Sequence, residues 1–290
     1  MNKKYIDFHT HTFPDKIAAA AVSKLGGCFA IENHTDGTVK GLLRSMEEGE
    51  VALSVVLPVV TNPASTVKMN DYAAASNEKL GEKGYCSFAG MHPDFSGYKE
   101  ELKRIKRLGL KGIKLHPAYQ NCNMDDIRYL RIVEEAASLD LIVVYHAGID
   151  GGLPTPVYAT VDMARHVVDT IGAEKLVLAH MGGWEQWEQA EQELCGAPVY
   201  FDTAACIGVM EARKSIPGAK DRVLMSKEQL ARMIRKHGTD KVLFATDSPW
   251  TGQKESLKIF KTLELTEQEK EMVLWENACR LLNHYFPASP

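Results

Sequence analysis

The chain has 290 residues, of which 45% are apolar and 25% are charged, and its formal net charge is −4. This is the composition of an ordinary globular protein, which excludes an intrinsically disordered chain. Charges of mixed sign with a small negative sum exclude a polybasic surface, so we expect neither nucleic acid nor a membrane as a partner. A small molecule is the partner that we expect.

The six cysteines are scattered and form no CxxC pair, which argues against a thiolate zinc site and against a disulfide framework. The first residues lack the apolar run of a signal peptide, and no run of 18 apolar residues occurs in the sequence. We therefore expect a cytoplasmic protein with reduced thiols.

Short apolar runs alternate with helical patterns along the chain. A β-like run over residues 5–11 ends in two histidines, and a helix that follows it is expected to stop at Gly26 and Gly27. Apolar runs typical of buried strands start near residues 5, 51, 85, 111, 141, 175, 198 and 241. Helical patterns cover residues 39–48, 66–80, 98–107, 125–139, 157–171, 185–194 and 227–237.

A succession of eight strand–helix units is typical of a TIM-type (β/α)8 barrel. The competing fold, a doubly wound open sheet, needs a glycine-rich phosphate turn after the first strand, and this chain has His9-Thr10-His11 there. The sequence therefore predicts an α/β protein with one barrel domain over residues 1–290. The helical tail over 263–282 is expected to pack outside the barrel.

The predicted strand ends are rich in metal-binding side chains. In a barrel, the carboxyl ends of the strands converge on the face where active sites lie. Those positions hold six histidines and one aspartate, namely His9, His11, His92, His116, His146, His180 and Asp247. Alternate residues of a strand face one side, so His9 and His11 can present both rings to one point. Imidazole and carboxylate ligands suit Zn²⁺, Mn²⁺ or Fe²⁺, so the sequence predicts a catalytic metal centre.

The chain resembles the amidohydrolase superfamily. The resemblance is carried by the HxH of the first strand, by His146 and His180, by the segment Ala245–Trp250 and by the late helix Glu276–Leu282. More narrowly, the chain is similar to the amidohydrolase-related group (amidohydrolase 2) that includes aminocarboxymuconate semialdehyde decarboxylase, resorcylate decarboxylases and pyrone-dicarboxylate lactonase. This group catalyses both hydrolysis and non-oxidative decarboxylation, so the resemblance specifies the fold and the metal site better than the reaction.

The resemblance also implies roles for individual residues. It makes His9, His11, His146 and Asp247 the ligands of one divalent cation, Zn²⁺ in the first place and Mn²⁺ as the alternative. It makes Asp247 the acceptor of a proton from the attacking water and His180 the residue that polarises the substrate or helps to activate that water. Binuclear relatives carry a carbamylated lysine at the end of the fourth strand. Lys114 lies two residues before that strand end, so we interpret the site as mononuclear.

Five further residues are candidates for contact with the substrate, namely His92, Lys114, His116, Trp184 and Trp250. Each also has an ordinary structural explanation. The two histidines precede prolines and can simply end a strand, the lysine can pair with a buried carboxylate, and the tryptophans can pack against loops.

We predict a hydrolase that directs an activated water at an amide, ester or lactone carbonyl of a small molecule. The alternative is a metal-dependent non-oxidative decarboxylase of an aromatic or enoic acid. A third reading, from another class, is a barrel that keeps the metal as a structural or binding element.

The βα loops, with 148–156 and 207–225 as candidate lids, carry the specificity and do not name the substrate. The oligomeric state is open, and a homodimer is the commonest arrangement.

Overall fold

The computed structural model describes residues 5–172 and 174–283. The chain divides into two compact units, unit 1 with Met1–Val56 and Thr203–Pro290 and unit 2 with Leu57–Asp202. Unit 2 is thus one continuous stretch, whereas unit 1 is assembled from both ends of the chain.

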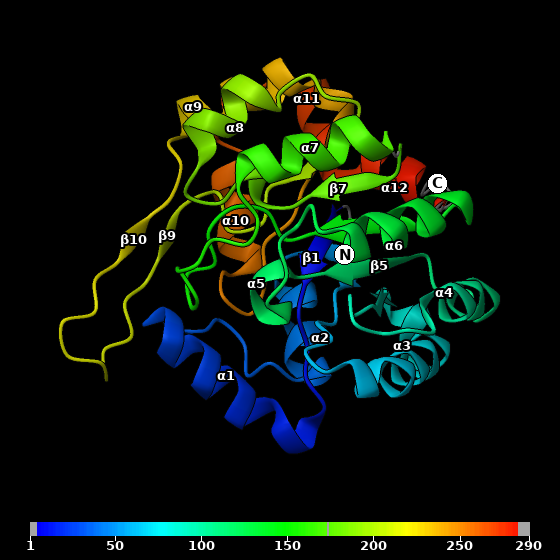
Figure 1. Cartoon of the computed structure of the whole chain (residues 1–290). Coiled ribbons are helices and arrows are strands. Elements are labelled where there is room, and N and C mark those ends of the chain that lie inside the picture. The colour runs from blue at the N-terminus through cyan, green and yellow to red at the C-terminus, as the bar shows by residue number, and fades with distance from the viewer. Residues whose placement is uncertain (1–4, 173, 284–290) are drawn as a thin grey trace. The chain divides into compact units, whose positions relative to one another are not determined.

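Unit 2 contains a row of parallel strands that alternate with helices (Figure 1). Neighbouring strands pair in parallel in the order β8-β7-β6-β5-β4. Apart from Cys86 and Tyr200, the strand residues of unit 2 are buried, which is why the strands read as short apolar runs in the sequence. The strands are β3 (Tyr85–Ser87), β4 (Ala89–Gly90), β5 (Gly112–Leu115), β6 (Ile142–Tyr145), β7 (Leu176–Leu178) and β8 (Tyr200–Asp202). The helices are η1 (Pro63–Ser65), α3 (Thr66–Leu80), η2 (Gly81–Lys83), α4 (Tyr98–Arg107), α5 (Pro117–Gln120), α6 (Ile127–Ser138), α7 (Val161–Ile171), η3 (His180–Gly182) and α8 (Trp187–Glu193).

In unit 1 the first strand lies between two parallel neighbours. β1 pairs with β2 on one side, with Ile6 opposite Leu53. On its other side residues 244–248 run alongside it, because Phe8 N donates to Phe244 O (2.9 Å) and His11 N donates to Ser248 O (2.6 Å). The strands are β1 (Tyr5–Thr10), β2 (Val51–Val56), β9 (Val209–Met210), β10 (Arg222–Val223) and β11 (Val242–Leu243). The helices are α1 (Asp15–Phe29), α2 (Val39–Glu48), α9 (Lys227–His237), η4 (Thr239–Lys241), α10 (Gln253–Phe260), α11 (Glu267–Glu271), the π-helix η5 (Met272–Glu276) and α12 (Asn277–Leu282).

All eight predicted strands form, and the helices α2, α3, α4 and α9 have the predicted bounds. The tail is helical as expected, although α11 begins only at Glu267, and it contacts the end of the sheet because Asn277 Nδ2 donates to Val242 O (2.8 Å). Helix α7 begins at Val161 instead of residue 157, because the side chain of Thr160 accepts from Met163 N as its N-cap.

The predicted stop of the first helix at Gly26 and Gly27 is wrong, since α1 continues to Phe29. These glycines provide space for a close neighbour. A Cβ on Gly26 would lie 3.2 Å from Ile31 O and 3.3 Å from Nη1 of Arg213, which donates to Ser23 O. The glycines therefore admit a side chain from a distant part of unit 1.

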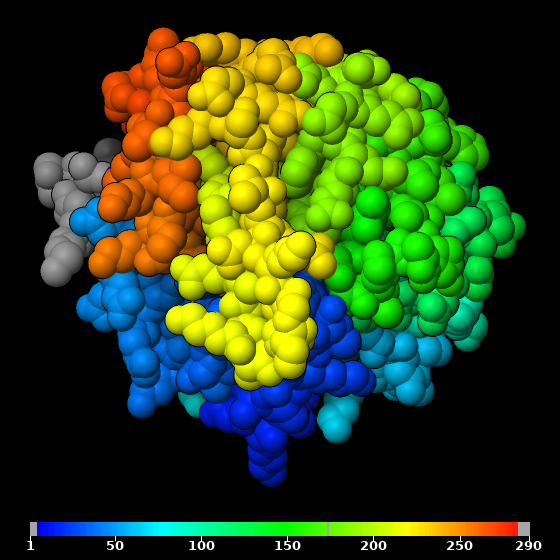
Figure 2. All heavy atoms as spheres, turned by 90° about the vertical axis from the view of Figure 1, so that its left-hand side faces the viewer, coloured from blue at the N-terminus to red at the C-terminus, as the bar shows by residue number. Residues whose placement is uncertain are grey.

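That side chain belongs to a hairpin within residues 207–225, where the sequence predicts only a loop. β9 and β10 pair antiparallel, with Val209 opposite Val223. Figures 1 and 2 show this hairpin (yellow) beside the N-terminal segment (blue). An antiparallel bridge between Ile31 and Ala212 joins the two segments.

Among the described residues, no helix is long and apolar enough to cross a membrane.

The Glu269 carboxylate of α11 gives a pH-dependent test of the fold of unit 1. Two hydrogen bonds from Arg235 and one from Thr266 N lower its pKa from 4.5 to about 2. The stabilisation is therefore present above pH 4.5 and is lost as the pH falls towards 2. We expect Glu269→Gln to lower the free energy of unfolding by about 1 kcal/mol at pH 7. In urea denaturation the difference from wild type should shrink at pH 3, and an equal difference at both pH values would contradict this assignment.

Candidate metal centre

Two histidines and one aspartate of unit 1 converge at the end of β1. Asp247 Oδ1 lies 3.1 Å from His11 Nε2 and 3.5 Å from His9 Nε2. The two imidazole rings are 5.1 Å apart and meet edge to face. His9 is almost fully buried, and His11 and Asp247 are each 14% exposed. The three side chains thus meet at one point with partial access to solvent.

Backbone hydrogen bonds place the aspartate beside the histidines. Asp247 N donates to His9 O (2.8 Å), in register with the bonds that join β1 to residues 244–248. Asp247 has a positive φ of 70°, so the chain leaves the strand direction at this residue. Trp250 N then donates to Asp247 O (2.9 Å) and closes the turn.

These three side chains fit a divalent transition-metal ion as ligands. One ligand atom each of His9, His11 and Asp247 lies within 4.8 Å of the other two. Two imidazoles and one carboxylate are ligands that Zn²⁺, Mn²⁺ and Fe²⁺ accept. Three protein ligands also leave coordination positions for a further ligand and for substrate.

Asp7 lies two residues before His9 on β1 and is completely buried. Its carboxylate accepts hydrogen bonds from Thr246 N (3.0 Å), Thr246 Oγ1 (2.6 Å) and Gln253 Nε2 (2.8 Å). Burial raises the pKa of Asp7 from 3.8 to about 6, and these hydrogen bonds oppose the rise. Asp7 is thus a buried acceptor on the same strand as His9 and His11.

Trp250 is buried and stacks on Phe29 of α1, with ring centroids 5.8 Å apart and an angle of 17° between the planes. Phe29 is only partly buried. The sequence points to Trp250 as a wall of the pocket, and the structure places its ring against α1 in unit 1.

In unit 2, three histidines occupy equivalent positions at the ends of neighbouring strands. Gly90 pairs with Lys114 and Lys114 pairs with Val144, and each of these residues lies two positions before a histidine. His92, His116 and His146 therefore form a row across β4, β5 and β6. Parallel strands lie about 4.8 Å apart, so side chains in such a row can touch.

Two rings of this row are in direct contact, and one of them also contacts His180. His116 and His146 stack with centroids 4.2 Å apart, and His146 Nδ1 lies 3.1 Å from His180 Nε2. Asp150 Oδ2 lies 3.7 Å from His116 Nε2. The other carboxylate oxygen of Asp150 accepts hydrogen bonds from Gly152 N (2.9 Å) and Leu153 N (2.8 Å), which fixes the orientation of the group. His116, His146 and Asp150 are a second set of side chains that could hold a cation.

The backbone of His180 is held at both ends. Its N–H donates to Asp202 Oδ1 (2.8 Å), and its carbonyl accepts from Trp187 Nε1 (3.0 Å). His180 has a positive φ of 59°, so the chain turns where β7 ends. These contacts direct the imidazole towards His146.

Lys114 and Trp184, two of the proposed substrate contacts, are buried in unit 2. Lys114 is 1% exposed within β5, although lysine is rarely buried to this extent. Trp184 is joined through its backbone to the loop after β6, because its N–H donates to Ala147 O (2.9 Å) and its carbonyl accepts from Ile149 N (3.0 Å).

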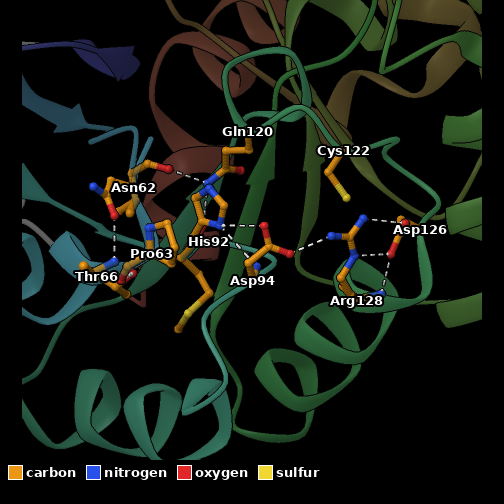
Figure 3. Close-up of polar contacts among 12 residues, drawn as sticks. Asn62, Pro63, Thr66, His92, Asp94, Gln120, Cys122, Asp126 and Arg128 are labelled. Carbon is orange, nitrogen blue, oxygen red and sulfur yellow. Dashed lines mark hydrogen bonds and ion pairs between the residues drawn. The ribbon is translucent and has the colours of Figure 1, made fainter.

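His92 is linked to the surface through a charged network (Figure 3). Its Nδ1 accepts from Asp94 N (3.1 Å), and the Asp94 carboxylate accepts from Arg128 Nη1 (2.6 Å). Arg128 also binds Asp126, whose pKa it lowers to about 2. Burial lowers the pKa of His92, which favours the neutral imidazole with its proton on Nε2.

Some of these residues were not singled out in the sequence. Asp202 ends the seventh strand, so the same inspection of strand ends could have found it. Asp7 shares the face of His9 at a spacing of two, which is a weaker signal. Asp150 lies in a loop between His146 and two glycines, and its Asp-Gly-Gly sequence indicates only a turn.

The model of the amidohydrolase family matches residues 6–283. The chain belongs to the amidohydrolase family. A comparison of the sequence with curated proteins gives no match.

Solved structures of several proteins share the fold of the chain. The chain is similar to 5-carboxyvanillate decarboxylase LigW from Sphingomonas paucimobilis, with 16% identity and a TM-score of 0.69 over 98% of this chain and 100% of that one. It is similar to a dihydroxybenzoic acid decarboxylase from Polaromonas sp. JS666 with bound manganese and an inhibitor, with 16% identity and a TM-score of 0.70 over 98% and 97%. A TIM-barrel protein of Bordetella bronchiseptica gives 16% identity and a TM-score of 0.71 over 96% and 98%.

These findings confirm the predicted TIM-barrel fold and make the chain an enzyme of the amidohydrolase superfamily. Among the described residues, the two His/Asp clusters are the groups that could hold a divalent cation.

The loop after β6 gives a test of the geometry around His146. Gly148 has a φ of +90°, and a Cβ there would lie 2.1 Å from Trp184 N, whereas Gly109 has a φ of +75° with no atom within 4 Å of a Cβ. We expect Gly109→Ala to cost about 1 kcal/mol through backbone strain alone. Gly148→Ala should cost about 3 kcal/mol or more, because the overlap with the Trp184 backbone adds to the strain. Gly148 and Trp184 form a parallel β-bridge. Equal losses of unfolding free energy for the two variants in urea denaturation would show that this bridge does not constrain the loop.

Proposed function

We propose that the chain is a metal-dependent hydrolase that acts on an amide, ester or lactone carbonyl of a small molecule. The convergence of His9, His11 and Asp247 is the observation that carries the proposal. A bound divalent cation supplies Lewis-acid chemistry, since it polarises a carbonyl oxygen and makes water a nucleophile at neutral pH.

The proposed ligands are His9, His11 and Asp247, with His146 as the fourth. The geometry of unit 1 supports the first three, and the family resemblance is the ground for adding His146. Zn²⁺ is the proposed cation, and the manganese in a structural neighbour makes Mn²⁺ the alternative.

The residues of the chain have two further proposed roles. The second carboxylate oxygen of Asp247 accepts the proton of the attacking water, which requires the carboxylate to be ionised before the transfer. The His180 imidazole donates a hydrogen bond to the oxyanion that develops on the substrate, because its backbone is fixed and its ring orientation is therefore defined.

Substrate contacts are proposed for His92, His116 and Lys114. The neutral His92 offers an N–H donor, and the side-chain nitrogen of the buried Lys114 suits a polar or anionic group of the substrate. Trp184 and Trp250 remain proposed walls of the pocket.

Non-oxidative decarboxylation of an aromatic or enoic acid is the second candidate. It is favoured by the structural neighbours whose titles name decarboxylases of 5-carboxyvanillate and dihydroxybenzoic acid. The same cation would then orient a substrate carboxylate, and a proton would be delivered to carbon.

The metal content of the purified protein is the first test. We expect about one Zn²⁺ or Mn²⁺ per chain by elemental analysis, because three or four ligands serve one ion. The double variant His9→Ala with Asp247→Ala should lose it, and His146→Ala should bind it more weakly. Two ions per chain would favour a carbamylated Lys114 as a bridge, and no ion after reconstitution would contradict the proposal.

The reaction is tested with the metal-loaded enzyme on panels of esters, lactones, amides and carboxylic acids. Asp247→Asn keeps the shape of the side chain and removes the proton acceptor, so we expect kcat to fall by about 10²-fold or more. Release of CO₂ without cleavage of a carbonyl bond would select decarboxylation. Full activity of metal-loaded Asp247→Asn would contradict the role of Asp247.

A further inference from the structure

The carboxylate of Asp7 joins the two segments that carry the converging ligands. On β1 its Oδ1 accepts from His9 N (3.3 Å). On the segment of Asp247, Oδ1 accepts from Thr246 N (3.0 Å) and Oδ2 accepts from Thr246 Oγ1 (2.6 Å). One buried side chain is therefore bonded directly to one ligand residue and to the neighbour of another.

Two further elements of unit 1 meet at this carboxylate. Gln253, the first residue of α10, donates through Nε2 to Asp7 Oδ2 (2.8 Å) and to Ser54 Oγ on β2 (2.9 Å). Asp7, Ser54 and Gln253 are completely buried, and Thr246 is 1% exposed. Asp7 is thus the common acceptor for β1, the segment of Asp247 and α10, and Gln253 extends the network to β2.

The position requires an acceptor with two oxygens. Four donor groups point at the carboxylate, two at each oxygen. An asparagine has only one acceptor oxygen, and its NH₂ group would face two of these donors. A polar group that only filled space in the core would not need this donor pattern, because an apolar residue fills space at a lower desolvation cost.

We propose that Asp7 is a positioning residue that fixes the spacing of His9 and Asp247 and thereby sets the affinity of the centre for its cation. The inference rests on the proposed function, since it concerns the same metal site. Groups that orient metal ligands from outside the coordination shell typically change metal affinity 10- to 100-fold when they are removed.

The test compares two variants of the Asp7 network with a control of similar burial. Asp7→Asn removes one acceptor oxygen and a charge, and Thr246→Val removes the hydroxyl donor while the charge stays. The control is Asn277→Ala, because Asn277 is also completely buried in unit 1 and donates to Thr239 O (2.7 Å) and Val242 O (2.8 Å), which lie outside residues 244–248 and outside the Asp7 network. Affinity for Zn²⁺ is measured by competition with a chromophoric chelator, and unfolding by urea is measured in parallel.

We expect Asp7→Asn and Thr246→Val to bind Zn²⁺ 10- to 100-fold more weakly than wild type. Asn277→Ala should lose stability and keep the wild-type affinity. The visible spectrum of the Co²⁺-loaded protein, which reports coordination geometry, should change in the first two variants and not in the control.

Wild-type affinity in both network variants, or an equal loss in the control, would overturn the positioning role while the metal site stands. If Asp7→Asn fails to fold, Thr246→Val decides the outcome. A wild-type protein that binds no cation after reconstitution would overturn the proposed function and this inference together.

Discussion

The parallel pairing of β1 with residues 244–248 is the constraint on which the candidate centre depends. Its backbone hydrogen bonds place Asp247 in register with His9 and His11, which lie more than two hundred residues earlier in the sequence. A shift of one residue would turn the side chains to the other face of the strand. The register therefore decides whether these three side chains meet as a candidate cation site.

The hydrogen bonds of Asp7 stabilise the same register. Asp7 accepts hydrogen bonds from β1, from Thr246 and from α10. The buried carboxylate therefore stabilises the one alignment of these segments in which all of these bonds form. Burying this group is costly, as the raised pKa of Asp7 reflects, and the four hydrogen bonds offset part of the cost. Specific alignment is what the chain gains from a polar group in an otherwise apolar core.

Much of this fold can be predicted from the sequence, because buried parallel strands read as short apolar runs with helical patterns between them. Helices with a clear polar face, such as α4 and α9, even have their predicted bounds. The errors arise where tertiary contacts override local preference. Gly26 normally favours a helix end, yet α1 continues because the glycine admits Arg213 from a hairpin nearly two hundred residues away. No local pattern contains that contact.

The candidate site is likewise predictable from the sequence only in part. His9, His11, His146, His180 and Asp247 can be found from the sequence, because each follows an apolar run and ligand types are recognisable at strand ends. Asp150 cannot be found in this way. It lies within a turn, and its role depends on how the amides of Gly152 and Leu153 aim the carboxylate at His116.

The division of the chain into a continuous unit and one built from both ends has a consequence for synthesis in the cell. A chain is made from its N-terminus, and domains generally fold as units during synthesis. His9 and His11 are made before Leu57–Asp202, and Asp247 is made only after it. The growing chain thus carries the histidine pair without Asp247 while the whole of Leu57–Asp202 is made. The three side chains of the candidate centre therefore meet only after residues 244–248 have paired with β1.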